Sequence, residues 1–204
     1  MTVADRDPGD PEQALVAMLA GDEAGFLVVF RDVQPRLLRY LSVLVGAGEA
    51  EDVAAETWSQ VVRDLARFRG DLDGFRGWVA TIGRHRALDH LRQRQRSRIA
   101  DVAVEDRPEP VGDDLAFLGA SEALGTERAV AMIASLPREQ AEAVMLRVVL
   151  GLDAASAAAV LGRRPGAVRT AAHRGLKALA AGLDERPALG VGNGIGTADA
   201  EGVS

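Results

Sequence analysis

Residues 136–179 read LPREQAEAVMLRVVLGLDAASAAAVLGRRPGAVRTAAHRGLKAL, and this stretch decides the fold of the second half of the chain. Two segments with apolar residues at helical spacing are separated at Gly162, and the second carries Arg169, Arg174 and Lys177. Such segments on either side of a glycine are typical of two helices joined by a tight turn. The pattern predicts a helix-turn-helix, whose second helix can enter the major groove of DNA.

A second basic stretch lies upstream, across an acidic connector. Residues 84–98 hold six arginines against Asp89 alone, residues 163–177 hold five basic residues and no acid, and residues 101–127 hold eight acids against Arg107. A single charge run is often only a solvated face. Two basic helices separated by an acidic connector can instead hold two separate places on DNA, although the net charge of the chain is −6.

The composition favours a helical protein. The hydrophobic fraction is 48%, but it is carried by alanine, valine and leucine, with only 4% aromatic residues. Such residues build helical bundles more readily than sheets. The chain has no cysteine, which excludes disulfides and thiolate metal sites. No run of 18 apolar residues and no signal-peptide pattern occurs, so we expect a cytoplasmic protein without membrane insertion.

Breaks in composition divide the chain into two predicted domains. We expect an all-α protein with a first domain at 12–98 and a second, helix-turn-helix domain at 120–183. Residues 99–119 hold two prolines and six acidic residues, so they are expected to form a flexible acidic linker. Residues 1–11 and 184–204 lack a periodic apolar face and are predicted to be disordered.

Apolar residues at helical spacing mark the helices of the first domain. Phe26, Phe30 and Leu41 indicate one helix that continues past Pro35 or two helices that meet there. After the glycine-rich turn at 46–48, a second apolar stripe leaves a polar face outside. This face consists of Glu51, Asp52, Glu56, Gln60 and Arg63.

A long helix is predicted from about residue 75 to residue 96, after the glycine-containing loop FRGDLDGF at 68–75. Phe75, Trp78 and Ile82 lie on the apolar side of this helix, and the apolar stripe then shifts around the helix. The shift leaves a polar stripe with spacings of four, three and four residues, formed by His85, Asp89, Arg92 and Arg96. We expect this polar stripe to contact something other than the protein core.

These segments together carry a family resemblance. Along residues 12–181 the chain shows, in order, GDEAGF, AEDVAAETW, FRGDLDGF, WVATIGRHRALDHLRQRQR, and the LP…GL…LG…GAVRTAAHRGLKAL pattern. In this order and spacing they resemble a bacterial sigma factor of the extracytoplasmic-function group. The resemblance implies two helical domains joined by a flexible linker, and a protein that binds core RNA polymerase and directs it to promoters.

The resemblance also implies roles at the matching positions. Asp52, Glu56 and their neighbours match the segment that docks on the clamp coiled coil of the largest polymerase subunit. Residues 69–75 match the loop that captures a base flipped from the −10 strand. The positions that match the −35-facing side of the recognition helix are Arg169, Thr170, His173 and Arg174.

Charge and spacing extend these assignments to three sets of site residues. The polymerase-binding set is Glu51, Asp52, Glu56, Gln60 and Arg63. The −10 set is Arg69, Gly70, Asp71, Phe75, Arg84, His85, Asp89, Arg92 and Arg96. The −35 set is Arg169, Thr170, His173, Arg174 and Lys177. On the last helix we expect Val168, Ala172, Leu176 and Leu179 to face inward.

Other kinds of site find little support in the residues. Trp58 and Trp78 fall on apolar stripes, which favours core positions over base stacking. His85 and His90 do not share a helix face, and His173 lies in the other domain, so no zinc site is expected. No nucleophile pairing or phosphate-loop signature occurs, so we expect neither an enzyme nor a cofactor.

Two other classes of function stay open at this point. One is a stand-alone helix-turn-helix regulator whose first domain senses a ligand or dimerises, and the other is a helical adaptor that binds only proteins. The partners expected from the resemblance are core RNA polymerase and promoter DNA. No motif identifies an anti-sigma factor, so that partner also stays open.

Overall fold

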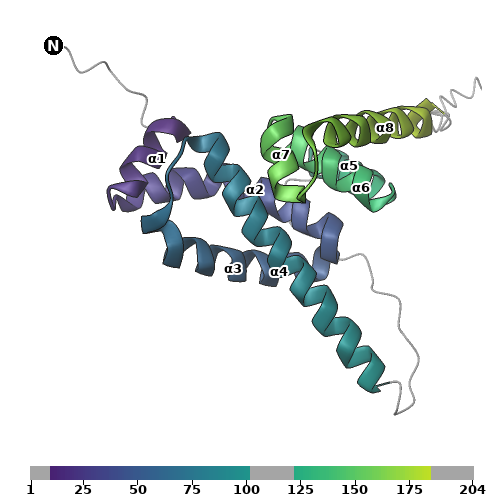
Figure 1. Ribbon diagram of the computed structural model, residues 1–204, viewed down its shortest axis with the longest axis horizontal. Coiled ribbons are helices and arrows are strands. Elements are labelled where there is room, and N and C mark those ends of the chain that lie inside the picture. Colours follow the sequence, from purple (N-terminus) through teal and green to yellow (C-terminus); the bar gives the residue numbers. More distant parts are fainter. Residues whose placement is uncertain (1–9, 102–121, 185–204) are drawn as a thin grey trace, which may run out of the picture.

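The computed structural model describes residues 10–101 and 122–184, and every regular element in these two ranges is a helix (Figure 1). The first domain comprises α1 (Pro11–Leu19), α2 (Glu23–Val45), α3 (Ala47–Asp64), the short 3-10 helix η1 (Leu65–Arg67) and α4 (Leu72–Asp101). The second comprises α5 (Glu122–Ala134), α6 (Arg138–Val144), the π-helical turn η2 (Met145–Val149), α7 (Ala154–Leu161) and α8 (Pro165–Asp184). The prediction of an all-α protein in two helical domains is confirmed.

The predicted acidic linker at 99–119 and the predicted disordered ends at 1–11 and 184–204 lie almost wholly outside the described residues. Short overlaps remain at their borders. Helix α1 begins at Pro11, α4 continues to Asp101 and α8 ends at Asp184. Within the described ranges, each helix is too short or too polar to span a bilayer.

Helix α2 continues through Pro35 as one helix, which decides between the two alternatives left by the sequence. Proline has no N–H, so the helical hydrogen bond from position 35 to the carbonyl of Arg31 is missing. Pro35 and Arg31 are both exposed, and water can therefore solvate the free carbonyl. At its start, α2 is capped by Asp22, whose carboxylate accepts a hydrogen bond from the backbone N–H of Gly25 at 3.0 Å.

Two aromatic groups fill the core of the first domain. Trp58 lies 4.8 Å from Phe30, measured between ring centroids, and its Nε1–H donates a 2.6 Å hydrogen bond to Gln34 Oε1. In the second group, the Phe68 ring lies 5.3 Å from Phe75, and Phe75 is completely buried. The prediction that Phe75 lies on the apolar side of the long helix is confirmed.

The second domain contains the predicted helix-turn-helix. Asp153 caps α7 by accepting a 2.6 Å hydrogen bond from the backbone N–H of Ser156. Gly162 ends α7 in the left-handed conformation, with φ of 63°, which costs glycine no steric strain. Helix α8 begins three residues later at Pro165, a residue well suited to the first helical position.

The inward face of α8 differs from the sequence prediction at one position. Val168 and Ala172 are buried as expected, whereas Leu176 is 45% exposed. Gly175 takes the inward place instead, because a Cβ there would lie only 2.8 Å from Val144 Cγ2 on α6. The two helices approach so closely that only glycine fits, which turns the wider leucine side chain next to it toward solvent.

The second domain packs against the first on the side formed by α2 and α4 (Figure 1). Tyr40 of α2 and Ala80 of α4 are completely buried, and both belong to the apolar core of the second domain. Leu152 approaches α4 from the second domain, and a Cβ on Gly77 would lie 4.0 Å from Leu152 Cδ2. The two domains therefore share one continuous apolar contact.

Candidate nucleic-acid interface

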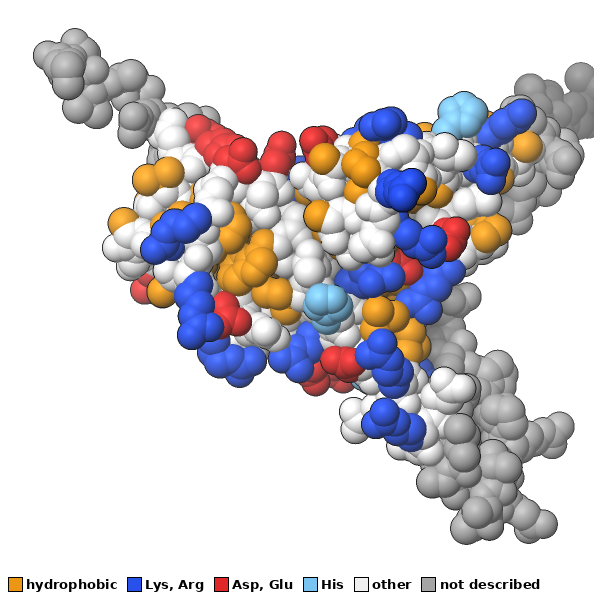
Figure 2. All heavy atoms as spheres, viewed as in Figure 1, with side chains coloured by type: hydrophobic (Ala, Val, Ile, Leu, Met, Phe, Trp, Pro, Cys, Tyr) orange, Lys and Arg blue, Asp and Glu red, His pale blue; other side chains and the backbone are white. Residues whose placement is uncertain are grey.

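The outer face of α8 is a solvent-exposed cationic surface. Arg169, Thr170, His173, Arg174 and Lys177 are all exposed. Figure 2 shows Lys and Arg side chains and one histidine gathered over the end of the molecule that α8 occupies. The four basic side chains of this set make no ion pair or side-chain hydrogen bond with another residue in the described part of the chain. They are free to meet phosphates or base edges.

A groove of about 560 Å³ runs beside this face, between the start of α6 and the first turns of α8. Thr170 and Arg174 line it from α8, and Arg138 and Gln140 line it from α6. The Thr170 hydroxyl donates a 3.0 Å hydrogen bond to the carbonyl of Gly166, so this side chain is already held along the helix. The groove puts polar side chains from both helices at the edge of the cationic surface.

The basic residues of α4 do not form one patch, although they are contiguous in sequence. Gln60 Oε1 accepts a hydrogen bond from Arg86, and Glu49 forms an ion pair with Arg94 at 3.5 Å and lies 3.0 Å from Nε2 of His90. These three basic side chains face α3 and hold α4 against it. All four residues of the predicted polar stripe, His85, Asp89, Arg92 and Arg96, face solvent.

Within this polar stripe, Asp89 and Arg92 pair with each other at 2.7 Å, and both side chains are more than 60% exposed. A pair so exposed contributes little to stability and can exchange one partner for a ligand at small cost. His85 and Arg96 make no ion pair with any residue of the described ranges. The stripe is therefore available to a partner along its whole length.

In the loop before α4, side chains are hydrogen-bonded to the backbone of the loop itself. Arg69 Nη1 donates to the carbonyls of Ala66 at 2.8 Å and Phe68 at 2.6 Å. Asp71 Oδ1 accepts from the backbone N–H of Gly74 at 2.8 Å and so caps the start of α4. Gly70 has φ of 150° and lies against the Phe68 ring. Arg69, Gly70 and Asp71 are exposed and form the rim of the loop.

Phe75 requires a correction to the predicted −10 set. Its ring is completely buried between Phe68 and Trp78, with centroid distances of 5.3 and 5.7 Å. A base could reach this ring only if the core opened. Phe75 supports the loop from beneath and does not reach solvent.

The polar face of α3 is exposed at four of the five predicted positions, Glu51, Asp52, Glu56 and Arg63. These four make no ion pair within the part of the chain that the structure describes. Gln60 is half-buried and bonds to both Arg86 of α4 and Asp64. The face can present carboxylates to a basic partner, whereas Gln60 joins α3 to α4.

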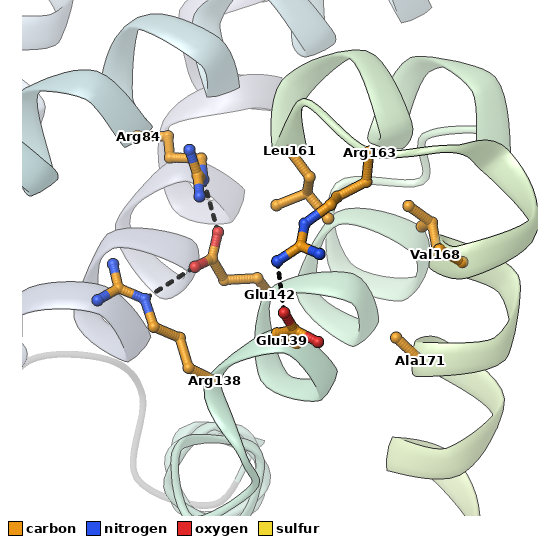
Figure 3. Close-up of a pocket in the computed structure, with 9 residues that line it drawn as sticks. Arg84, Arg138, Glu139, Glu142, Leu161, Arg163, Val168 and Ala171 are labelled. Atoms are coloured by element: carbon orange, nitrogen blue, oxygen red, sulfur yellow. Dashed lines mark hydrogen bonds and ion pairs between the residues drawn. The ribbon is translucent and has the colours of Figure 1, made fainter.

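Arg84 does not lie on the solvent stripe but points to the second domain. Its Nε donates a 2.6 Å hydrogen bond to Glu142 Oε2, and Arg138 Nε bonds the other carboxylate oxygen at 2.9 Å (Figure 3). Burial alone would lower the pKa of Arg84, but the hydrogen bond and the negative charge of Glu142 outweigh it and raise the pKa above its usual value. Arg84 is held as a cation inside a domain contact.

Sequence reasoning missed the residues that meet Arg84. Glu142 is only 3% exposed, and its partner in the first domain lies 58 residues away. One signal was present, because Glu142 stands among Ala141, Ala143 and Val144 in a run whose other members are buried. An acid inside an apolar run indicates a paired, buried charge.

Among the described residues, no group of three or more histidine, aspartate or glutamate side chains is arranged to hold a metal ion. His90 faces Glu49, His85 lies on the solvent side of α4, and His173 lies on α8. The arrangement can do two things chemically. It offers cations to an anionic polymer on α4 and α8, and carboxylates to a basic partner on α3.

Two family models match the chain. Residues 29–97 match sigma-70 region 2, and residues 126–179 match sigma-70 region 4. The first match covers most of α2, all of α3 and most of α4, and the second covers most of α5 to α8. The two regions occur in the same order as the two helical domains.

Individual proteins agree with these models. The extracytoplasmic-function RNA polymerase sigma factor SigD of Mycobacterium tuberculosis is 34% identical over 178 residues, which cover 84% of this chain and 83% of SigD. A solved structure of CnrH in complex with the cytosolic domain of CnrY aligns with a TM-score of 0.57 at 22% identity, over 86% of this chain and 98% of CnrH. RpoE of Bartonella quintana, solved with the anti-sigma factor NepR, aligns with a TM-score of 0.59 at 20% identity, over 79% of this chain and 98% of RpoE.

Proposed function

This chain belongs to the extracytoplasmic-function sigma factors, which direct core RNA polymerase to promoters, and from that premise we propose which of its surfaces carries each step. A stand-alone helix-turn-helix regulator is not favoured, because both sigma regions are present in order. The family is non-enzymatic in general, and phosphodiester chemistry belongs to the polymerase. We place the protein in the cytoplasm, where the polymerase works on the chromosome.

The −35 element is bound by α8 in this proposal. The observation that carries it is the exposed cationic face on the second helix of the helix-turn-helix. Residues near the start of a recognition helix usually reach base edges, so Arg169 is assigned to a guanine edge. Lys177 lies two turns further along and is assigned to a phosphate. Thr170, His173 and Arg174 complete the contact surface.

The −10 element is opened by the loop before α4 together with the solvent stripe of α4. Flipping a base from its stack costs a few kcal/mol, so the site has to supply contacts that compensate. In the exposed rim, the side chains of Arg69 and Asp71 are hydrogen-bonded to the backbone of the loop, which lowers the entropy lost on binding. His85, Asp89, Arg92 and Arg96 then follow the displaced strand. Phe75 is left out of this set because it is buried.

Polymerase is bound by the exposed side of α3. Glu51, Asp52 and Glu56 present three carboxylates and Arg63 adds one cation. Exposed ion pairs with a basic helix are each worth only about 0.2–1 kcal/mol, so their main effect is to orient the two surfaces. Gln60 is assigned to positioning α4, because it bonds to Arg86.

An anti-sigma factor is a further proposed partner. CnrH and RpoE of Bartonella quintana, which share this fold, were solved with CnrY and the anti-sigma factor NepR respectively. We propose that this chain is also regulated by a protein of that class. Co-expression with each candidate encoded near its gene, followed by co-purification, tests the proposal, and failure of every such protein to co-purify would contradict it.

Run-off transcription tests the proposed function directly. Core polymerase supplied with this protein should start at specific promoters, whereas core polymerase alone should not. Shortening the loop at 69–71 should abolish promoter opening, read as permanganate reactivity of unpaired thymines, but spare assembly with polymerase. His85→Ala should weaken opening less. Normal permanganate reactivity in the shortened protein would refute the loop assignment.

A further inference from the structure

The contact between the two domains contains a buried charge cluster. Glu142 of α6 is 3% exposed and bonds to Arg84 of the first domain and Arg138 of its own domain. Figure 3 shows the three side chains converging beside a pocket of about 240 Å³ at the junction. A buried carboxylate is tolerated only while it is paired, so docking of the domains and pairing of Glu142 with Arg84 depend on each other.

Tyr40 stands next to this cluster and is completely buried. Burial, followed by the negative charge of Glu142, raises the pKa of Tyr40 above its usual value. Its hydroxyl makes no well-formed hydrogen bond within the described part of the chain. The contact therefore combines a specific ion pair with a buried tyrosine whose hydroxyl lies beside Glu142.

Arg84 is the link between this contact and DNA. It immediately precedes His85, the first residue of the solvent stripe, but its guanidinium is taken by Glu142 and only 21% of its side chain is exposed. A carboxylate and a phosphate are both anionic acceptors that guanidinium groups bind by charge-assisted hydrogen bonds. Glu142 thus holds Arg84 in the way a DNA phosphate would hold it.

We propose that Glu142 is an internal competitor for promoter DNA: it keeps the second domain docked on α4 and withholds Arg84 from the −10 strand until the domains separate. The proposal rests on the assignment of α4 to −10 DNA under the proposed function. In the free protein the docked state lowers affinity for single-stranded DNA. Undocking releases Arg84 and uncovers the side of α4 around Ala80 at the same time.

The test uses the full chain carrying Glu142→Gln, with Glu139→Gln as its matched control. Both changes remove one negative charge from α6, but Glu139 is 71% exposed and pairs with Arg163 inside the second domain. The chain has no cysteine, so dyes can be placed specifically through Ser59→Cys on α3 and Ala178→Cys on α8, two exposed positions. Energy transfer between the dyes reports docking, and anisotropy of a short labelled single-stranded oligonucleotide reports binding.

Glu142→Gln should lower energy transfer and tighten binding of the oligonucleotide by about tenfold, the effect of losing a hydrogen bond between charged groups. Glu139→Gln should leave energy transfer unchanged and alter binding by no more than about twofold. Unchanged energy transfer in Glu142→Gln would overturn the proposal. So would a fall in energy transfer without tighter binding.

A second variant guards against misfolding of the second domain, since Glu142 also bonds to Arg138. Ala80→Leu adds bulk on the α4 side of the contact and keeps every charge, and it should lower energy transfer and tighten binding as Glu142→Gln does. Far-UV circular dichroism checks that both variants stay folded, and docking that persists in folded Ala80→Leu would count against the proposal. Run-off transcription by the wild-type protein is scored separately, so its failure would refute the promoter function while the docking result would still stand.

Discussion

Helix α4 carries seven arginines and two histidines, whereas α8 carries two arginines, one lysine and one histidine, and the two helices present these side chains differently. On α8 the cations of the −35 set are all exposed and unpaired within the described residues. On α4 the second domain holds Arg84, Asp32 of α2 holds Arg76, and three basic side chains face α3, whereas His85, Arg92 and Arg96 reach solvent. The number of basic residues along a helix therefore does not give the number available to a ligand, because neighbouring elements pair with some of them.

The inner faces of the two helices differ as well. Helix α4 fills space with large side chains such as Phe75, whereas α8 removes side-chain volume at Gly175 so that α6 can approach. The first arrangement depends on buried volume and the second on close backbone approach. A substitution that removes side-chain volume should therefore destabilise the packing of α4, whereas one that adds volume should destabilise the packing of α8.

The largest effect is expected at Phe75. Phe75→Ala should cost about 3–5 kcal/mol of unfolding free energy, because it leaves a cavity beneath the loop. Val62→Ala serves as control, since Val62 is 56% exposed, and should change stability by no more than about 0.5 kcal/mol. Urea denaturation measures both. A loss at Phe75 as small as that at Val62 would mean that the ring is not a core residue.

A smaller loss is expected at Gly175. Gly175→Ala should destabilise by about 1–3 kcal/mol, because the new Cβ meets Val144 at 2.8 Å. Gly182→Ala, on the same helix with open space around it, should instead stabilise by about 0.5–1 kcal/mol through lower chain entropy in the unfolded state. Thermal unfolding compares the two. Equal gains would show that α6 and α8 do not approach so closely.

The outer face of α8 is tested by binding. Arg169→Ala should cost roughly 1–3 kcal/mol in polymerase-dependent promoter binding and relax preference at one −35 base pair. Lys177→Ala should weaken all sequences alike and flatten the salt dependence by about one unit. A promoter library scored with both variants separates the two roles. Equal, sequence-independent losses would remove Arg169 from base reading.

The smallest effect concerns the cap that begins the helix-turn-helix. The backbone hydrogen bond from Ser156 lowers the pKa of Asp153 below its usual value of 3.8. A lowered pKa in the folded protein gives stability that is fully present above that usual value and is lost as the pH falls through the lowered one. Wild type should therefore be more stable than Asp153→Asn at pH 7, and the difference should shrink below pH 3.8. Urea midpoints measured across this range check the sign, and a difference that grows on acidification would contradict it.

The sequence predicted the positions of the helices better than the way the helices pack against one another. Helical periodicity located α3, α4, α7 and α8, since each has an apolar stripe that repeats locally. It placed Leu176 inward because glycine has no side chain to count, although Gly175 is the residue against α6. Close approach between helices is a property of the pair and leaves no trace in the periodicity of one.

In the candidate sites, too, features of a single helix were predictable from the sequence, whereas contacts between helices were not. Exposed residues on α3 and α8 could be located from spacing because a helix has only one outside. Phe75 was assigned to both the core and the base-binding loop, and only the packed structure chooses the core. Arg84 and Glu142 could not be paired from sequence, because they lie 58 residues apart in different domains.

The placement of the aromatic residues gives the protein a natural set of optical probes. Both tryptophans and the single tyrosine of the chain belong to the first domain. Trp58 and Trp78 are surrounded by phenylalanine rings, so their emission reports the melting of that domain alone. Tyr40 is buried against the second domain, and its ultraviolet absorption is sensitive to solvent. Difference spectroscopy on the unlabelled protein can thus separate undocking from unfolding.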